Sequence, residues 1–166
     1  MNHEIEKQLS AAIALPDQPQ RAFDWLAKLS DQLIGAKLFT VMANEPNEGL
    51  SERLYTNMPD AYPVSGTKPY NRTYWSQVTL EQQRTFVANT IEDIAEVFDD
   101  YKLIQSLGCE SVINVPIVVG GEVIGTINCL HDKNHYSAER VEAAKQLVVP
   151  GAICLLLAKV QKEGEK

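Results

Sequence analysis

The hydrophobic and polar residues near the start of the chain recur at helical spacing, which predicts two helices. The first lies over residues 5–13 and is broken by Pro16. The second begins near residues 17–19, because proline is tolerated in the first turn of a helix, and Gly35 ends it as a C-cap glycine. Apolar residues within 23–34 form one face of this second helix, which is therefore amphipathic.

A last helix is predicted from Ser137, whose side chain is a good N-cap, to about residue 160. Its segment 147–158 is apolar almost all round, so we expect it to be buried on more than one side. This run is too short for a membrane span and contains Pro150 and Gly151, which favours a buried helix. One side can pack on a sheet, and the N-terminal helices or a second copy of the chain would cover the other.

Alternation of apolar and polar residues predicts strands over 37–44 and 50–57, which a turn cluster at 45–49 joins into a hairpin. After this hairpin the chain becomes irregular and rich in aromatic residues, with a short helix predicted over 72–80 and a short strand over 84–88. Long loops with aromatic content of their own are often functional.

Two further short helices are predicted from the capping residues at their N-termini. Thr90 is expected to cap one of them, and Asp99 and Asp100 are expected to cap the next, which covers 101–107. Gly108 then ends this second short helix. The two acidic residues at its start are therefore assigned to capping rather than to acid–base catalysis.

The clearest hairpin is predicted over 111–119 and 122–130, because the Gly120-Gly121 dipeptide supplies the positive φ angles of a two-residue turn. Both faces of its strands are mostly apolar, so we expect both faces to be covered. Counting back from the turn places Asn114 and Asn128 on opposite faces of the sheet. A buried amide needs hydrogen-bond partners, and this register predicts that at most one of the two amides meets a ligand.

Composition narrows the function classes. The 166 residues suit one domain, so an output partner in signalling would be another chain. The net charge of −7 argues against nucleic-acid binding. Cys109, Cys129 and Cys154 fit neither a disulfide framework nor a zinc pattern. Because the first residues also lack the pattern of a signal peptide, we expect a cytoplasmic protein with reduced thiols and no membrane partner.

The order of these elements and several motifs resemble the GAF domain family. The resemblance covers roughly residues 21–157 and rests on motifs in a fixed order. They are Trp75-Ser76-Gln77-Val78, a G-x-x-S motif at 108–111, Val115-Pro116-Ile117, Gly120-Gly121 and Val123-Ile124-Gly125. We therefore divide the chain into an N-terminal helix (1–16), a GAF domain (17–160) and a C-terminal tail (161–166).

This resemblance implies an α/β (α+β) fold, with a central antiparallel sheet of about six strands, helices on one face and a pocket on the other. It also implies a homodimer formed through the terminal helices. Many members bind a nucleotide, a chromophore, haem or a small metabolite, whereas others only dimerise. Fold alone therefore leaves two interpretations open, a small-molecule-binding sensory module and a non-binding dimerisation scaffold.

The motifs disfavour several known ligands of the family. The cyclic-nucleotide signature Asn-Lys-Phe-Asp-Glu has no counterpart here, and no cysteine is followed by the histidine that bilin-binding members carry. His131 and His135 are expected near the surface, where they are poor axial ligands for haem. The cofactor, if there is one, stays unknown, and no metal site is predicted.

One enzyme class resembles this chain as a single-domain GAF protein, the free methionine sulfoxide reductase. That chemistry needs a thiol of lowered pKa in the pocket and a second thiol within reach. Only Cys109 stands near a matching position, and Glu110 beside it disfavours a thiolate. This reductase is the less favoured alternative.

The pocket is predicted between the sheet and residues 70–95. A small-molecule site combines apolar walls with a few polar groups. The predicted ligand-binding residues, four for the walls and two for polar contacts, are Tyr74, Trp75, Phe86, Asn89, Asn114 and Asn128.

Overall fold

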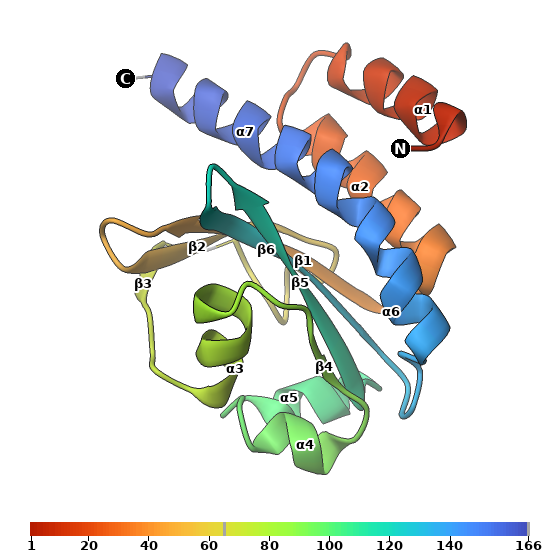
Figure 1. The fold of residues 1–166 in the computed structure, drawn as a ribbon, viewed down its shortest axis with the longest axis vertical. Helices are drawn as coiled ribbons and strands as arrows, with labels where there is room; N and C mark the ends of the chain where they lie inside the picture. The colour runs from red at the N-terminus through yellow and green to blue at the C-terminus, as the bar shows by residue number, and fades with distance from the viewer. Residues whose placement is uncertain (65, 166) are drawn as a thin grey trace.

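The alternating segments of the chain form one antiparallel sheet with the strand order β3-β2-β1-β6-β5-β4. The computed structural model describes residues 1–64 and 66–165 (Figure 1). Its strands are β1 (Leu38–Glu45), β2 (Leu50–Thr56), β3 (Lys68–Pro69), β4 (Phe86–Ala88), β5 (Ser111–Val119) and β6 (Glu122–His131). The predicted fold class and the five predicted strands are confirmed. The sixth, β3, has two residues, which is too short to show alternation in the sequence.

Long helices cover one face of the sheet (Figure 1). They are α2 (Gln20–Ile34), α6 (Ala138–Ala144) and α7 (Val148–Gly164), with a 3-10 turn at Lys145–Leu147 between the last two. The first helix, α1 (His3–Ile13), packs against α2 on the outer side of this layer (Figure 1). The main core lies between these helices and the sheet, where Phe23, Val41 and Ile127 are almost completely buried. Full burial of one such side chain contributes about 1.5–3 kcal/mol, so the apolar face of α2 anchors it to the sheet.

The last helix packs closely on the sheet at its proline and glycine. Pro150 lacks an N–H and is tolerated only near a helix start, and the 3-10 turn lies directly before α7. A Cβ atom on Gly151 would lie 2.7 Å from Ile127 Cδ1 and 3.0 Å from Ile117 Cδ1, so glycine permits this approach. Burial of α7 on its sheet side is as expected.

The helical segment Ala138–Gly164 is longer than the apolar run that the sequence singles out. With 27 residues and a mean hydropathy of 1.6 it is long and apolar enough to cross a membrane. One such helix is weak evidence for a membrane protein, because the core helix of a soluble protein has the same properties. Cys154 and Leu155 of this segment belong to the main core, which is typical of a core helix.

The predicted register of the second hairpin is wrong beyond its first pair. Val118 pairs with Val123 as expected, but Ile117 pairs with Gly125, so Ile124 is an extra residue of β6. Such a β-bulge shifts all later pairs by one residue, so the side chains of one strand lie on the opposite face from the one that simple alternation assigns to them. Asn114 consequently pairs with Asn128, on the same face of the sheet.

A second bulge lies in the first hairpin. Val41 pairs with Tyr55, whereas Met42 pairs with Arg53, so Leu54 is the extra residue of β2. Tyr55 joins the main core beneath the helices, and Arg53 faces the opposite side of the sheet. Simple alternation would have placed these two side chains on one face.

Short segments cover this opposite face (Figure 1). They are α3 (Tyr74–Ser76), a π-helical turn (Gln77–Glu81), α4 (Ile91–Ala95) and α5 (Tyr101–Ser106). Thr90 caps α4 as predicted, since its side chain accepts a hydrogen bond from the backbone N–H of Asp93 at 3.2 Å. A second apolar cluster, which includes Phe86, Ile94 and Cys109, fixes these segments on the sheet.

Candidate functional site

A cavity of about 200 Å³ lies between the sheet and the short segments. Its floor comes from β1, β5 and β6, and Arg53 of β2 lies at one side. The loop residue Tyr62 and the aromatic side chains of Trp75 and Phe98 cover it, together with Asp100 and Ile104. The floor residues are Leu38, Thr40, Met42, Val112, Asn114, Thr126, Asn128 and Leu130. The site thus has mostly apolar walls with a few polar groups, as small-molecule sites do.

Cross-strand pairing arranges the floor in three rows. The first row is apolar and consists of Leu38, Leu130 and Val112. The second row is polar and consists of Thr40, Asn128 and Asn114. The third row consists of Arg53, Met42 and Thr126. Both bulges are needed for this pattern, because they turn Arg53 and Asn114 towards the cavity.

The polar second row is joined into one chain of hydrogen bonds. Trp75 Nε1 donates to Asn114 Oδ1 at 3.0 Å, and Asn114 Nδ2 donates to Asn128 Oδ1 at 2.6 Å. Asn128 Nδ2 then donates to Thr40 Oγ1 at 3.2 Å. The buried amides therefore satisfy one another, and the chain fixes the Trp75 ring over the floor.

The third row is not satisfied in this way. The buried Thr126 Oγ1 and the buried Arg53 Nε have no hydrogen-bond partner within residues 1–64 and 66–165. Thr126 is only 1% exposed, so its hydroxyl has lost its contact with solvent. Buried polar groups without partners are rare, and in a cavity they mark positions where a ligand or an ordered water completes the bonding.

Arg53 is held beside the cavity by the loop. Its Nη1 donates to the carbonyl oxygen of Pro63 at 2.9 Å, and its guanidinium carbon lies 5.0 Å from the centre of the Tyr62 ring. Burial lowers the pKa of Arg53, with the nearby Tyr62 and Asp100 acting in the opposite direction. The guanidinium remains charged, because even a lowered pKa of an arginine stays far above neutral.

Asp100 has a different role from the predicted one. It stands at the start of α5 but makes no side-chain cap bond; its carboxylate accepts a hydrogen bond from the Tyr62 hydroxyl. Burial and this bond raise the pKa of Tyr62. The pair therefore fastens the loop to α5 at the edge of the cavity.

The structure brings three of the six predicted site residues to the cavity: Trp75, Asn114 and Asn128. Tyr74 is 64% exposed, and its ring makes an edge contact with Phe86, which is buried in the second apolar cluster. Asn89 bonds the backbone of Tyr136 through both ends of its amide, at 3.0 Å each.

Sequence reasoning missed Arg53, Tyr62 and Thr126. The only signal for Arg53 was a charged residue inside an alternating strand, and the bulge reverses the face that alternation assigns to it. Tyr62 lies in an irregular segment, where no periodicity relates a residue to the sheet.

None of the three thiols lines the cavity, since no cysteine is among its described lining residues. Cys109 is buried in the second apolar cluster, and this burial raises its pKa, although Lys37 acts against the shift. Cys129 and Cys154 lie in the main core on the helix side, where burial raises the pKa of Cys154 to about 12. None of these settings favours a nucleophilic thiolate.

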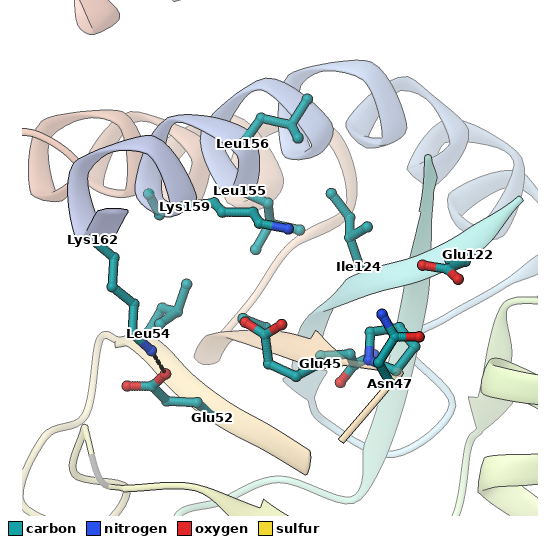
Figure 2. Close-up of a pocket in the computed structure, with 14 residues that line it drawn as sticks. Glu45, Asn47, Glu52, Leu54, Glu122, Ile124, Leu155, Leu156, Lys159 and Lys162 are labelled. Carbon is teal, nitrogen blue, oxygen red and sulfur yellow. Dashed lines mark hydrogen bonds and ion pairs between the residues drawn. The ribbon is translucent and has the colours of Figure 1, made fainter. Parts of the chain in front are cut away.

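A second hollow lies on the helix side, between α7 and the β1–β2 hairpin (Figure 2). It measures about 130 Å³ and has apolar sides from Leu54, Ile124 and Leu155. At its rim Lys162 Nζ lies 2.7 Å from Glu52 Oε2, as the dashed line in Figure 2 marks. Glu45, Glu122 and Lys159 also line this hollow. It is the weaker candidate for a ligand site because it is smaller than the cavity over the sheet, which measures about 200 Å³.

The fold and the cavity define a class of protein, in which an antiparallel sheet carries long helices on one face and a cavity on the other. A sequence model of the GAF domain matches residues 19–155. The chain belongs to the GAF domain family. No match to a curated protein is found by sequence comparison.

Solved GAF structures share this fold at low sequence identity. The GAF domain of a two-component sensor histidine kinase from Bacillus halodurans has 15% identity and a TM-score of 0.66, covering 89% of this chain and 98% of its own. Free methionine-R-sulfoxide reductase from Neisseria meningitidis, solved with its substrate, has 13% identity and a TM-score of 0.69, covering 95% and 89%. The phycoerythrobilin-bound GAF domain of a cyanobacterial phytochrome has 13% identity and a TM-score of 0.67, covering 98% of each chain.

Proposed function

We propose that this protein is a cytoplasmic sensory or regulatory module that binds a small organic molecule in the cavity over the sheet. The observation that carries the proposal is the unsatisfied third row, in which Thr126 Oγ1 and Arg53 Nε are buried without partners in the described part of the chain. A cavity filled only by its own side chains would favour apolar groups at these positions. The ligand-bound state of two structural neighbours, by their titles, agrees with such a role for the fold.

Cavity size limits the ligand. Sites for drug-sized molecules measure about 300–1,000 Å³, so a cavity of about 200 Å³ suits a smaller molecule. A further hollow of about 330 Å³ adjoins it, and Trp75 and Phe98 line both spaces. A larger ligand would have to displace one of these two rings.

Binding is a better interpretation than thiol chemistry. The reductase interpretation requires a reactive cysteine at the cavity, whereas Cys109 is buried in an apolar cluster with a raised pKa. A simple assay separates the two functions, because a reductase would lose all methionine sulfoxide reduction on Cys109→Ser. We expect no such activity in either form of the protein.

We also propose a homodimer formed through α7, with no membrane or nucleic-acid partner. Val149, Leu156 and Val160 lie along one side of α7 and are 51%, 41% and 64% exposed. A stripe of this kind on a helix favours contact with a second apolar surface. A dimerising module without a ligand is the alternative, and it shares this surface.

Native mass spectrometry of protein purified from its own cells tests the binding proposal. We expect each chain to carry one small molecule that denaturation releases for identification. A protein that is empty in such a preparation, and that no metabolite fraction of those cells stabilises against heat, would support the scaffold alternative instead. The same spectrum reports the number of chains in the assembly.

A further inference from the structure

The geometry points to a small monocarboxylate as the ligand, with its carboxylate on Arg53 and a hydrogen-bonding group at Thr126. This inference rests on the proposed binding function and adds the chemical class. It begins from the third row of the floor, where Arg53 and Thr126 flank Met42 on neighbouring strands. Two strand spacings separate the Cα atoms of the outer residues by about 10 Å. A molecule that satisfies both groups must therefore cross the floor over Met42.

Arg53 offers the free edge that a carboxylate recognises. Its Nη1 is engaged by the carbonyl oxygen of Pro63, and this leaves the edge formed by Nε and Nη2 facing away from that bond. The Nε–H on this edge is buried and has no partner among the described residues. Two parallel N–H groups on one edge match the two oxygens of a carboxylate, which makes the pairing both strong and directional.

No acidic side chain within the described residues compensates this cation by an ion pair of 4.0 Å or less. Asp100 is the acidic residue among those that line the cavity, and it is exposed and accepts the Tyr62 hydroxyl. Asp100 lies near enough to act on the pKa of Arg53 but forms no close ion pair with it, so the half-buried guanidinium still favours a negatively charged ligand in direct contact.

The charges of Arg53 and Asp100 also limit the charge of the ligand. Arg53 is the cation that faces the cavity among the described residues, and Asp100 lies at its edge. A dianion such as a phosphate monoester would meet one cation and be repelled by one carboxylate. A singly charged carboxylate needs only the Arg53 edge, which is why we assign this class rather than a phosphate.

The far end of the ligand meets Thr126. A hydroxyl can donate one hydrogen bond and accept others, so an alcohol, a phenol or a carbonyl would each satisfy it. The surfaces between the two polar ends are apolar and aromatic, from Met42, Trp75 and Phe98. The ligand therefore has an apolar or flat body with a carboxylate at one end and a polar group at the other.

Calorimetric titration with matched acids and amides tests the inference. The probes are acetate, benzoate, phenylacetate and 3-phenylpropanoate, each beside its neutral amide, which has nearly the same shape. We expect the best acid of this series to bind at least about tenfold more tightly than its amide, because a charged hydrogen-bonded pair is replaced by a neutral one. The acid should lose this preference in Arg53→Gln and keep it in Arg84→Gln, a control at an exposed arginine.

A second pair of probes tests the far end. In the wild-type protein 4-hydroxyphenylacetate should bind more tightly than phenylacetate, and Thr126→Val should remove this difference while leaving the acid–amide preference intact. Circular dichroism of each variant confirms that it is folded.

Two results would overturn the inference. Amides that bind as tightly as the acids would show that the cavity accepts small molecules without selecting a carboxylate, so the proposed function would stand alone. Failure of every acid to bind at millimolar concentration, with or without binding of an amide, would also reject the carboxylate. The proposed function itself fails only if, in addition, the protein from its own cells is empty and no metabolite fraction of those cells stabilises it against heat.

Discussion

At the scale of single residues, the proposed binding depends on buried polar atoms that lack partners within residues 1–64 and 66–165. Thr126 is paired across the sheet with Met42 and Pro116, and neither neighbour can satisfy its hydroxyl with a side chain. Asn114 and Asn128, which the sequence singled out as polar contacts, bond each other. The buried atoms Thr126 Oγ1 and Arg53 Nε, which lack partners among the described residues, thus lie in the third row, beside the row of the amides.

Thr126→Val is expected to stabilise the ligand-free protein. Valine has nearly the shape of threonine, and removal of a buried hydroxyl without a partner should raise the free energy of unfolding by about 1 kcal/mol. Urea unfolding of ligand-free protein measures this change. A loss of stability instead would mean that the hydroxyl is already satisfied, for example by a buried water.

Gly125→Ala is expected to destabilise the fold. A Cβ atom there would lie 2.4 Å from the backbone oxygen of Met42 and 2.7 Å from Leu155 Cδ1, and a backbone atom cannot move aside cheaply. The cost of such overpacking is about 1–3 kcal/mol in the free energy of unfolding. Gly164→Ala is the control, since none of the described residues lies within 4 Å of its added Cβ, and it should be neutral or slightly stabilising. Equal stability of the two variants would contradict the close packing of α7 on β6.

At the scale of elements, the sequence predicted most of the helices and strands. Gly35 ends α2 with a φ of 78°, and Ser137 caps α6 through a bond from the Arg140 N–H, both as expected. These are local signals, because a cap or a C-terminal glycine acts within a few residues of its own position. They can therefore be read without knowledge of the tertiary structure.

The two bulges could not be predicted in this way. Leu54 and Ile124 are ordinary apolar residues in alternating strands, and both pack against the main core from the helix side. Their effect is seen only when the strands are paired. Since each bulge reverses the facing of the residues that follow, the sequence separated Asn114 from Asn128 and gave no position for Arg53.

The candidate site could be predicted only in part, because some of its residues give a local signal in the sequence and others do not. Trp75 is the first residue of a motif of the GAF family, and it lines the cavity. Asn114 and Asn128 are visible in the sequence as polar residues in apolar strands. Tyr62 and Asp100 belong to the cavity through a side-chain bond between residues 38 positions apart. Contacts of this range depend on the whole fold, so local patterns carry no signal for them.

At the scale of the whole molecule, the two faces of the sheet have separate tasks. The long helices lie over the main core on one face, and the short segments lie over the other face (Figure 1). The cavity lies between these short segments and the sheet. The strands are shared by both faces, so the proposed ligand would contact the same strands on which the helices pack. This arrangement would suit the proposed module, in which α7 carries the proposed dimer surface.

The double substitution Leu156→Glu and Val160→Glu is expected to convert the proposed dimer into a monomer. Two charges on the exposed stripe of α7 would have to be buried unpaired in an interface, which is strongly unfavourable. Light scattering after size-exclusion chromatography measures the mass. Gln161→Glu, at an exposed polar position of the same helix, is the control and should leave the assembly unchanged. A wild-type protein that is monomeric throughout would rule out the dimer.

The location of the bound molecule tests the central claim most directly. We would determine the crystal structure of the protein with the molecule that its own cells supply, or with the tightest-binding acid of the probe series. The account predicts electron density across Met42 between Arg53 and Thr126, beneath the Trp75 ring. Density instead in the hollow between α7 and the β1–β2 hairpin (Figure 2), with the cavity over the sheet holding only water, would contradict it.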